Sequence, residues 1–326
     1  MEIAFHSAGQ LKAVLKSIGY EMEISQLSIG PLAGRFRLGG SSRVPVFSIS
    51  TNQAMVFEGG RRPGWLPFCI ATGQERSFVR GEEVSSHSLH GFRSDLQDSF
   101  FQLQNGSHLQ VALVSRTRLE QLALAGREHR VLDMISTCNS VALPAERFRG
   151  LTRLFQPQKR DPLQADLIET ELLDLLSRRD LTQIGSGELS HRADLMKDLI
   201  RWGQTNPTQV ISLEDLSATI FASRSAIVSS CRSMFGIGPM ALLKRIRLGQ
   251  VQDTLRNPQM RHAIGCRTVQ QVAAHYGFQS RNHFARDYRQ MFGEAPSATL
   301  QSSGGKGSLC QPVSVAQSPQ MAIARR

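Results

Sequence analysis

One short segment near residue 285 carries side chains that can read DNA. Arg281, Asn282, Ala285 and Arg286 follow Ser280 at the spacing of one helical face. Arginine can pair with guanine O6 and N7, and asparagine with adenine N6 and N7. These residue types predict a helix that contacts base edges in the major groove. A solvated surface helix is the alternative, since this face alone is a weak signal.

The sequence around that face predicts a scaffold of two short helices. Thr268 and Gln271 have the spacing of a capping box at the start of the first helix. Gly277 suits the left-handed residue that ends it, and Ser280 can cap the second helix. The apolar positions of the pair are Val269, Val272, Ala273, Phe278, Phe284, Tyr288 and Met291 or Phe292. Two capped helices around a glycine corner predict a helix-turn-helix unit.

The same plan occurs a second time, between Leu213 and Phe235. Leu216 and Ile220 continue the apolar side of the first helix, and Ser223 can cap the second. The inward positions of that second helix are Ile227, Cys231 and Met234 or Phe235. Its outward positions, which we expect to read bases, are Arg224, Ser225, Val228, Ser229 and Arg232. A repeated unit is harder to dismiss than a single one.

A helix is predicted to join the two units. Pro239 suits its first turn, and an apolar stripe continues to Leu255. Ser225 and Asn282, which occupy equivalent outward positions, are 57 residues apart, enough for a rigid connecting helix between neighbouring grooves. The predicted phosphate contacts are Lys244, Arg245, Arg247, Thr268, Ser280 and Arg289. The alternative for the basic cluster on the connecting helix is that it only solubilises that helix.

The positive charge of the chain lies mainly in this C-terminal region. The net charge is +11 for 326 residues. Residues 1–189 hold 21 Lys and Arg against 20 Asp and Glu, whereas residues 190–302 hold 14 against 7. Each cation near a phosphate releases a condensed counterion, so this distribution favours double-stranded DNA as the partner. A membrane surface would attract the same charge, which makes charge alone weak evidence.

These motifs resemble the DNA-binding domain of AraC-type transcription regulators over roughly residues 190–302. The resemblance rests on the two units, on FGIGPMALLKRIRL between them and on the closing Phe292-Gly293 and Pro296; the connecting segment looks closest to ethanolamine-utilisation regulators. It implies an activator that recruits RNA polymerase, with an N-terminal domain that binds a small-molecule effector or forms a homodimer. Ethanolamine or a cobalamin as effector follows only from this similarity. Phe221 departs from the family pattern at a corner where glycine is common.

The first part of the chain predicts a barrel-like β domain followed by helices, so the expected fold class is α+β. Short strand-like stretches at Val44–Ser50, Ala54–Glu58, Trp65–Ala71 and Leu109–Ser115 alternate with glycine-rich turns. The expected divisions are an effector or dimerisation domain over 1–163, a connecting helix and linker over 164–189, the DNA-binding domain over 190–302 and a disordered tail over 303–326. The apolar stripe of the connecting helix, Ile168, Leu172 and Leu175, either seals the first domain or pairs with a second copy.

Other residue patterns point away from further chemistry. The five cysteines are scattered and are expected to be reduced, and His87 and His90 lie at a spacing that a strand would place on opposite faces, so neither group predicts a metal site. Trp65 and Phe68 are expected in the core rather than in an effector pocket. With no catalytic motif and no signal or membrane segment, the prediction is a cytoplasmic regulator without a cofactor, not an enzyme. The alternative is a basic architectural or RNA-binding protein.

Overall fold

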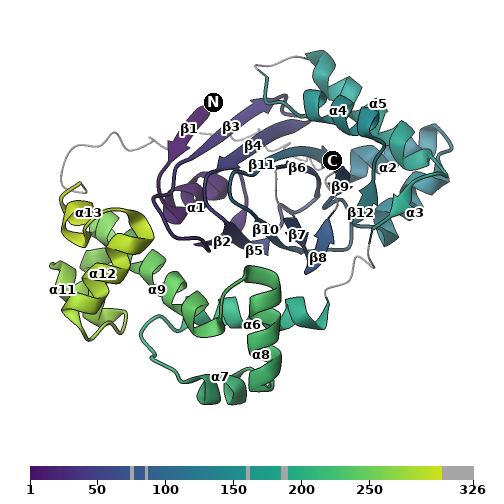
Figure 1. Cartoon of the computed structure of the whole chain (residues 1–326). Helices are drawn as coiled ribbons and strands as arrows, with labels where there is room; N and C mark the ends of the chain where they lie inside the picture. Colours follow the sequence, from purple (N-terminus) through teal and green to yellow (C-terminus); the bar gives the residue numbers. More distant parts are fainter. Residues whose placement is uncertain (74–76, 85–86, 159–161, 185–189, 303–326) are drawn as a thin grey trace, which may run out of the picture.

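The structure is a computed structural model that describes residues 1–73, 77–84, 87–158, 162–184 and 190–302 (Figure 1). Its first part consists of β1 (Glu2–Phe5), α1 (Ala8–Ser17), β2 (Glu21–Gln26), β3 (Gly34–Gly40), β4 (Pro45–Thr51), β5 (Met55–Gly60), β6 (Trp65–Thr72), β7 (Ser77–Val79), β8 (Glu82–Val84), β9 (Ser88–His90), β10 (Asp98–Leu103) and β11 (His108–Ser115). The helices and short strands that follow are α2 (Arg116–Ala125), α3 (His129–Thr137), β12 (Ser140–Ala142), α4 (Ala145–Leu154), α5 (Pro162–Ser177) and β13 (Thr182–Gln183). The last part is helical: α6 (His191–Thr205), α7 (Leu213–Thr219), α8 (Arg224–Phe235), α9 (Pro239–Arg256), α10 (Pro258–Ala263), α11 (Val269–His275), α12 (Arg281–Phe292) and α13 (Pro296–Ser302).

The strands form two antiparallel sheets. One has the order β1-β3-β4-β11-β6-β9-β12-β13 and the other the order β2-β5-β10-β7-β8. The α+β fold class is therefore confirmed, with an N-terminal β domain and a C-terminal helical domain. The four predicted strand stretches coincide with β4, β5, β6 and β11, while the glycine-rich spacing did not predict α1 or the shorter strands.

The sequence of β11 is almost continuously apolar because both faces of its sheet are covered. Because side chains alternate along a strand, Leu109 and Val111 enter the core between the two sheets, whereas Ala112 and Val114 enter a second core on the other face. Helices α2–α5 cover that second face (Figure 1). A sheet covered on both faces lacks the polar positions that mark an exposed face.

The α5 stripe seals the first domain. Ile168, Leu172 and Leu175 are fully buried in the same core as Val114 of β11. α5 therefore packs against the N-terminal domain, which is the first of the two alternatives that the sequence left open for its stripe. Residues 185–189, with the predicted Gly185-Ser186-Gly187 joint, and residues 303–326, with the predicted tail, lie outside the described residues.

The two domains share a core at the second sheet. Along β5, Met55 and Phe57 face the inter-sheet core, whereas Val56 faces the same cluster as Leu199 and Ile200 of α6. An ion pair from Arg201 to Glu58 and a hydrogen bond from Gln204 to Ser25 (3.0 Å) flank this contact. The first helix of the C-terminal part is thus seated on the β domain.

Candidate nucleic-acid interface

Helix α12 presents the predicted reading face to solvent. The Ser280 side chain accepts a hydrogen bond from the backbone N–H of His283, so the helix begins where the sequence places its cap. Phe284 and Tyr288 are buried on one side of the helix. On the opposite side, Arg281, Asn282, Arg286 and Arg289 are exposed and Ala285 is half-buried. The apolar spacing alone therefore sets which side chains are available to a groove.

The corner before α12 has the predicted geometry. The Thr268 side chain and the Gln271 side chain exchange hydrogen bonds with each other's backbone, which completes the capping box of α11. Gly277 takes a φ of +79°, and a Cβ at this position would lie 3.0 Å from Cγ2 of Val210. Phe278 packs against Phe284, with ring centroids 5.1 Å apart. These contacts fix the angle between α11 and α12.

Four of the predicted DNA contacts of this second unit line one hollow. Thr268, Arg281, Ala285 and Arg289 all border a cavity of about 520 Å³ between α11, α12 and the start of α13. Two of these were predicted to read bases and two to hold phosphates. The structure therefore brings the two kinds of predicted contact together on one surface.

The first unit repeats the arrangement with a weaker corner. Ser223 caps α8, and Ile227 and Cys231 are buried as predicted. Arg224 lies on the outer face, where it pairs with Glu214 of α7 at 2.9 Å. The other outward residues are Ser225, Ser229 and Arg232, which are exposed, and Val228, which is half-buried.

Phe221 occupies the corner of this first unit in an unusual state. Its φ is +51°, the same left-handed region as Gly277, and the residue is 96% exposed. A non-glycine residue in this region costs roughly 1–2 kcal/mol. The first unit thus has the same left-handed corner as the second, although the residue there is a strained and exposed phenylalanine.

The predicted connecting helix is α9, with Pro239 in its first turn. Its 18 residues span roughly 27 Å, comparable to the distance of about 34 Å between successive major grooves on one face of DNA. Leu248 and Val251 pack in the core of the second unit, whereas Leu243 packs in that of the first. One rigid element therefore sets the separation of the two reading faces.

The basic cluster on α9 is engaged within the protein. Lys244 forms an ion pair with Asp287 of α12, and Arg247 donates to the backbone carbonyl of Gln209 at 2.8 Å. Arg245 lines a cavity of about 550 Å³ between the two domains, and burial lowers its pKa. In this arrangement the half-buried Arg245 faces the β domain, and its phosphate contact stays a prediction. Arg247 is half-buried, and Lys244 keeps an exposed side chain.

A buried polar network behind α12 was not predicted from the sequence. The Tyr288 hydroxyl donates to Thr299 at 2.9 Å, and the Thr299 hydroxyl donates to Glu294 at 2.7 Å. Arg256, at the end of α9, pairs with the same carboxylate. Tyr288 and Thr299 are fully buried, so these bonds satisfy groups that would otherwise be costly. Tyr288, Glu294 and Thr299 are close in the sequence, whereas Arg256 comes from a distant segment.

The remaining sequence predictions fall in the β domain. His87 lies edge-on to Phe148 with ring centroids 4.8 Å apart, while His90 is buried at an internal cavity. Phe68 is fully buried against Phe92, and Trp65 is half-buried beneath the guanidinium of Arg62. The four cysteines in the described part of the chain are all free thiols.

No single helix of the described residues is both long and apolar enough to cross a membrane. Helices α8 and α9 meet that criterion only as a pair, across a bend of 61°. Their apolar faces are buried in the cores described above.

Residues 216–302 match the family described as a helix-turn-helix domain. A probable AraC family transcriptional regulator from Rhodopseudomonas palustris CGA009, known from its crystal structure, is 34% identical to this chain. The match covers 34% of this chain and 97% of that protein. The C-terminal region is an AraC-type helix-turn-helix domain. Both units of this AraC-type domain lie in the region that our motif analysis assigned to them.

Curated relatives match the same region. The XylDLEGF operon transcriptional activator 2 of Pseudomonas putida is 28% identical over 134 residues, which is 41% of this chain and 80% of that relative. Activator 3 of the same operon is also 28% identical, but the match covers only 38% of its length. The chain thus spans well under half of this longer relative. Both proteins are named as transcriptional activators and not as enzymes, in agreement with the sequence prediction.

Whole-chain comparisons add little beyond the AraC-type domain. ToxT from Vibrio cholerae O395 is 11% identical, over 88% of this chain and 99% of its own, with a TM-score of 0.32. The Rhodopseudomonas structure also has a low TM-score, 0.30. Scores of this size carry no argument about the arrangement of the domains. The relatives named here are not ethanolamine-utilisation regulators, so that narrower resemblance stays a prediction.

Proposed function

We propose that this protein is a sequence-specific DNA-binding transcription regulator, an activator whose N-terminal domain controls DNA binding in response to a small-molecule effector. One observation carries the proposal. Two capped helix pairs expose faces rich in hydrogen-bond donors, and a single helix, α9, joins their cores. Such an arrangement suits the insertion of both faces into successive major grooves of one duplex.

The residues assigned to base edges in this proposal are those on the outer faces of the two second helices. They are Arg224, Ser225, Val228, Ser229 and Arg232 in α8, and Arg281, Asn282, Ala285 and Arg286 in α12. Thr268, Ser280 and Arg289 contact phosphates, since Thr268 and Ser280 sit at helix N-termini beside the reading face. Lys244 joins them if its ion pair with Asp287 opens on DNA.

The finer parts of the proposal follow from the relatives. The named activators support activation, which in turn calls for contact with RNA polymerase. Homodimerisation through the N-terminal domain and a domain boundary near residue 189 belong to the same proposal. None of these parts is needed for the DNA-binding test.

The test is a selection of the full chain against a random DNA library, followed by gel shifts on the enriched site. We expect a defined site with two contacted segments about one helical turn apart. Arg281→Ala and Arg286→Ala should each weaken binding by roughly 1–3 kcal/mol at one base step. Arg149→Ala, which removes an exposed arginine from α4 in the β domain, is the matched control and should bind like wild type.

The alternative, a basic architectural or RNA-binding protein, makes a different prediction. Such a protein would protect DNA without enriching any site, and the arginine substitutions would weaken all sequences alike. Enrichment of no site by the full chain would refute the proposed function.

A further inference from the structure

A cavity lies inside the N-terminal domain, between its two sheets. Its volume is about 60 Å³, which corresponds to roughly four to six water molecules, or about 120 to 180 Å³ of liquid. Most of its wall is apolar and belongs to the inter-sheet core, formed by Leu15, Met22, Phe47, Ile49, Leu109 and Val111. Water has few partners over this part of the wall, so the cavity suits a small molecule with an apolar body.

One end of the cavity carries buried polar atoms that lack partners. Among the described residues, Nδ1 of His90 and Nε of Arg80 have no hydrogen-bond partner, although these residues are only 5% and 7% exposed. A buried polar atom without a partner calls for a group that satisfies it, such as water or a ligand. Burial, with a smaller contribution from Arg61, lowers the pKa of His90 to about 4, so its ring is neutral and can donate or accept a hydrogen bond.

Arg80 is held at the cavity by a strained backbone. It takes a φ of +52° in the tight turn between β7 and β8, directly before Gly81. Two-residue turns of this kind favour asparagine, aspartate or glycine at that place. An arginine there is unfavourable for the turn itself, which indicates that its side chain serves another purpose.

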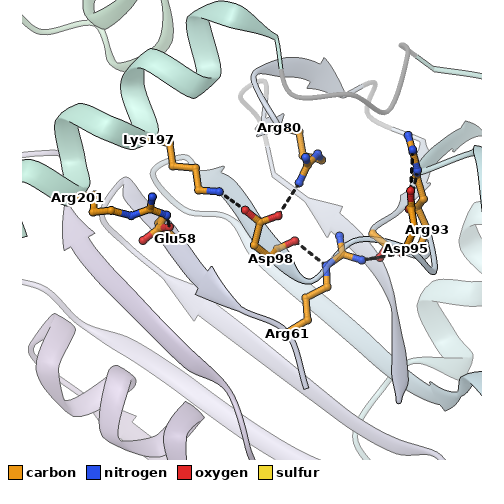
Figure 2. A network of polar contacts seen from close by, with 9 residues as sticks. Glu58, Arg61, Arg80, Arg93, Asp95, Asp98, Lys197 and Arg201 are labelled. Carbon is orange, nitrogen blue, oxygen red and sulfur yellow. Dashed lines mark hydrogen bonds and ion pairs between the residues drawn. The ribbon is translucent and has the colours of Figure 1, made fainter. Parts of the chain in front are cut away.

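The polar end of the cavity has an excess of positive charge. The Arg61 guanidinium donates to the backbone carbonyls of Asp98 (2.8 Å), Gly91 (2.8 Å) and Arg93 (3.0 Å), and it reaches no carboxylate within the described part of the chain. Arg80 shares the single carboxylate of Asp98 with Lys197 of α6 (Figure 2). Arg80 and Lys197 thus share one carboxylate, and Arg61 interacts with Asp95 only at a distance; a buried cation without a directly bound counterion favours an incoming anion.

We propose that this cavity binds a small monocarboxylate with an apolar body, whose carboxylate meets Arg61, Arg80 and His90. The proposal rests on the proposed function, because it gives a chemical class to the effector of the regulator. A guanidinium fork matches a carboxylate in shape as well as in charge. Ethanolamine, a cation, does not fit an end of the cavity that already carries uncompensated positive charge.

The same residues connect the cavity to the DNA-binding domain. Asp98 lies on β10 between Arg80, which lines the cavity, and Lys197, which belongs to the first helix of the C-terminal part. Burial opposes ionisation of Asp98, but hydrogen bonds from Lys197 and Arg80 outweigh it and lower the pKa of the carboxyl. A bound carboxylate competes with Asp98 for Arg80, so occupancy of the cavity changes the contact that holds α6 on the β domain.

The test measures binding of butanoate to the full chain by calorimetry and by thermal shift, with butanamide as a neutral molecule of nearly the same shape. We expect saturable binding of butanoate and binding of butanamide weaker by about tenfold or more, since only the acid gains a charge-assisted contact. Arg80→Gln should reduce butanoate affinity by a similar factor. Arg62→Gln is the matched control, because Arg62 stacks on Trp65 outside this cavity.

A second variant guards against loss of folding in Arg80→Gln. Ile49→Phe fills the apolar part of the cavity, leaves the polar end unchanged and should abolish binding of butanoate while the circular dichroism spectrum stays native. The proposal is overturned if acetate, propanoate and butanoate all fail to bind, or if butanamide binds as well as butanoate. Equal loss of binding in Arg62→Gln and Arg80→Gln would also overturn it.

Failure here and failure of the proposed function are distinguishable. A chain that selects a DNA site but binds none of the acids refutes only the cavity assignment. A chain that binds butanoate but selects no DNA site refutes the regulator. The link between the two sites is tested by Lys197→Met, which should weaken butanoate binding, because Asp98 then pairs with Arg80 alone, and should remove any effect of butanoate on DNA affinity.

Discussion

The strained corner of the first helix-turn-helix unit offers a sharp test of the structure. Phe221 lies in the left-handed region and is 96% exposed, so its ring contributes no burial to the fold. We predict that Phe221→Gly leaves the full chain as stable as wild type or stabilises it by up to about 1.5 kcal/mol. Relief of the left-handed conformation gains roughly 1–2 kcal/mol, while the greater freedom of glycine in the unfolded chain takes back roughly 0.5–1 kcal/mol.

Phe221→Ala separates the ring from the backbone. It removes the same ring but keeps the left-handed strain, so its free energy of unfolding should lie within about 0.5 kcal/mol of wild type. Urea denaturation followed by circular dichroism measures both variants, with comparison of the midpoints at equal slope. If Phe221→Ala destabilises the protein by more than about 1 kcal/mol, the ring is packed against something and the exposed corner is wrong.

The same variants ask why a phenylalanine is kept at this place. A residue that is strained and solvated in the free protein is expected to make its contact in the complex. We therefore expect Phe221→Gly and Phe221→Ala to weaken binding to the selected DNA site in gel shifts, despite normal stability. Wild-type affinity in both variants would show that the ring has no part in DNA binding.

Three further predictions concern other parts of the molecule. Gly277→Ala should destabilise the protein by roughly 1–2 kcal/mol in urea denaturation, because the new Cβ must adopt a left-handed angle and meets Val210 at 3.0 Å; a neutral effect would contradict the corner geometry. The pKa of His90 is lowered from 6.5 to about 4 in the folded protein. Between these two pH values the unfolded chain binds a proton at this residue and the folded chain does not, so the free energy of unfolding should fall by about 3 kcal/mol as the pH drops from 6.5 to 4. His90→Asn should flatten this part of the stability curve, and an unchanged curve would mean that another group causes the fall. Lys244→Met should reduce the slope of log affinity against log salt by about 1 if the side chain leaves Asp287 for a phosphate, whereas an unchanged slope would confine Lys244 to its internal ion pair.

Local signals in the sequence predicted which faces of α8 and α12 are exposed. The caps at Ser223, Thr268 and Ser280 and the apolar spacing along α8 and α12 act within a few residues, so the exposed faces follow from the chain itself. The roles of those faces could not be predicted with the same force, because side chains on a solvated helix and on a reading helix are alike.

Contacts between distant segments were the part that local patterns missed. The stripe on α5 is equally compatible with a coiled coil and with a buried helix, and only the neighbouring sheet decides that it is buried. Arg80 and Lys197 are far apart in the sequence, and no spacing rule joins them through Asp98. Arg245 was predicted to contact phosphate from its charge and its basic neighbours, and no local pattern indicates that it also lines the cavity between the two domains.

The β domain contacts both helix-turn-helix units at separate points. Lys197 and Arg201 of α6 bind the second sheet beside the first unit, while the backbone N–H of Gly30 donates to the carbonyl of Met291, at the end of α12, at 3.0 Å. Asp253 of α9 lies against Gly9 of α1 between these points. α9 is rigid and both units are packed on it. A shift of α6 on the sheet therefore moves the first unit and also strains the contacts of Gly9 with α9 and of Gly30 with α12. A ligand that changes the Asp98 contact is therefore expected to act on how the β domain holds both units together, and not on the separation of the two predicted reading faces, which α9 sets.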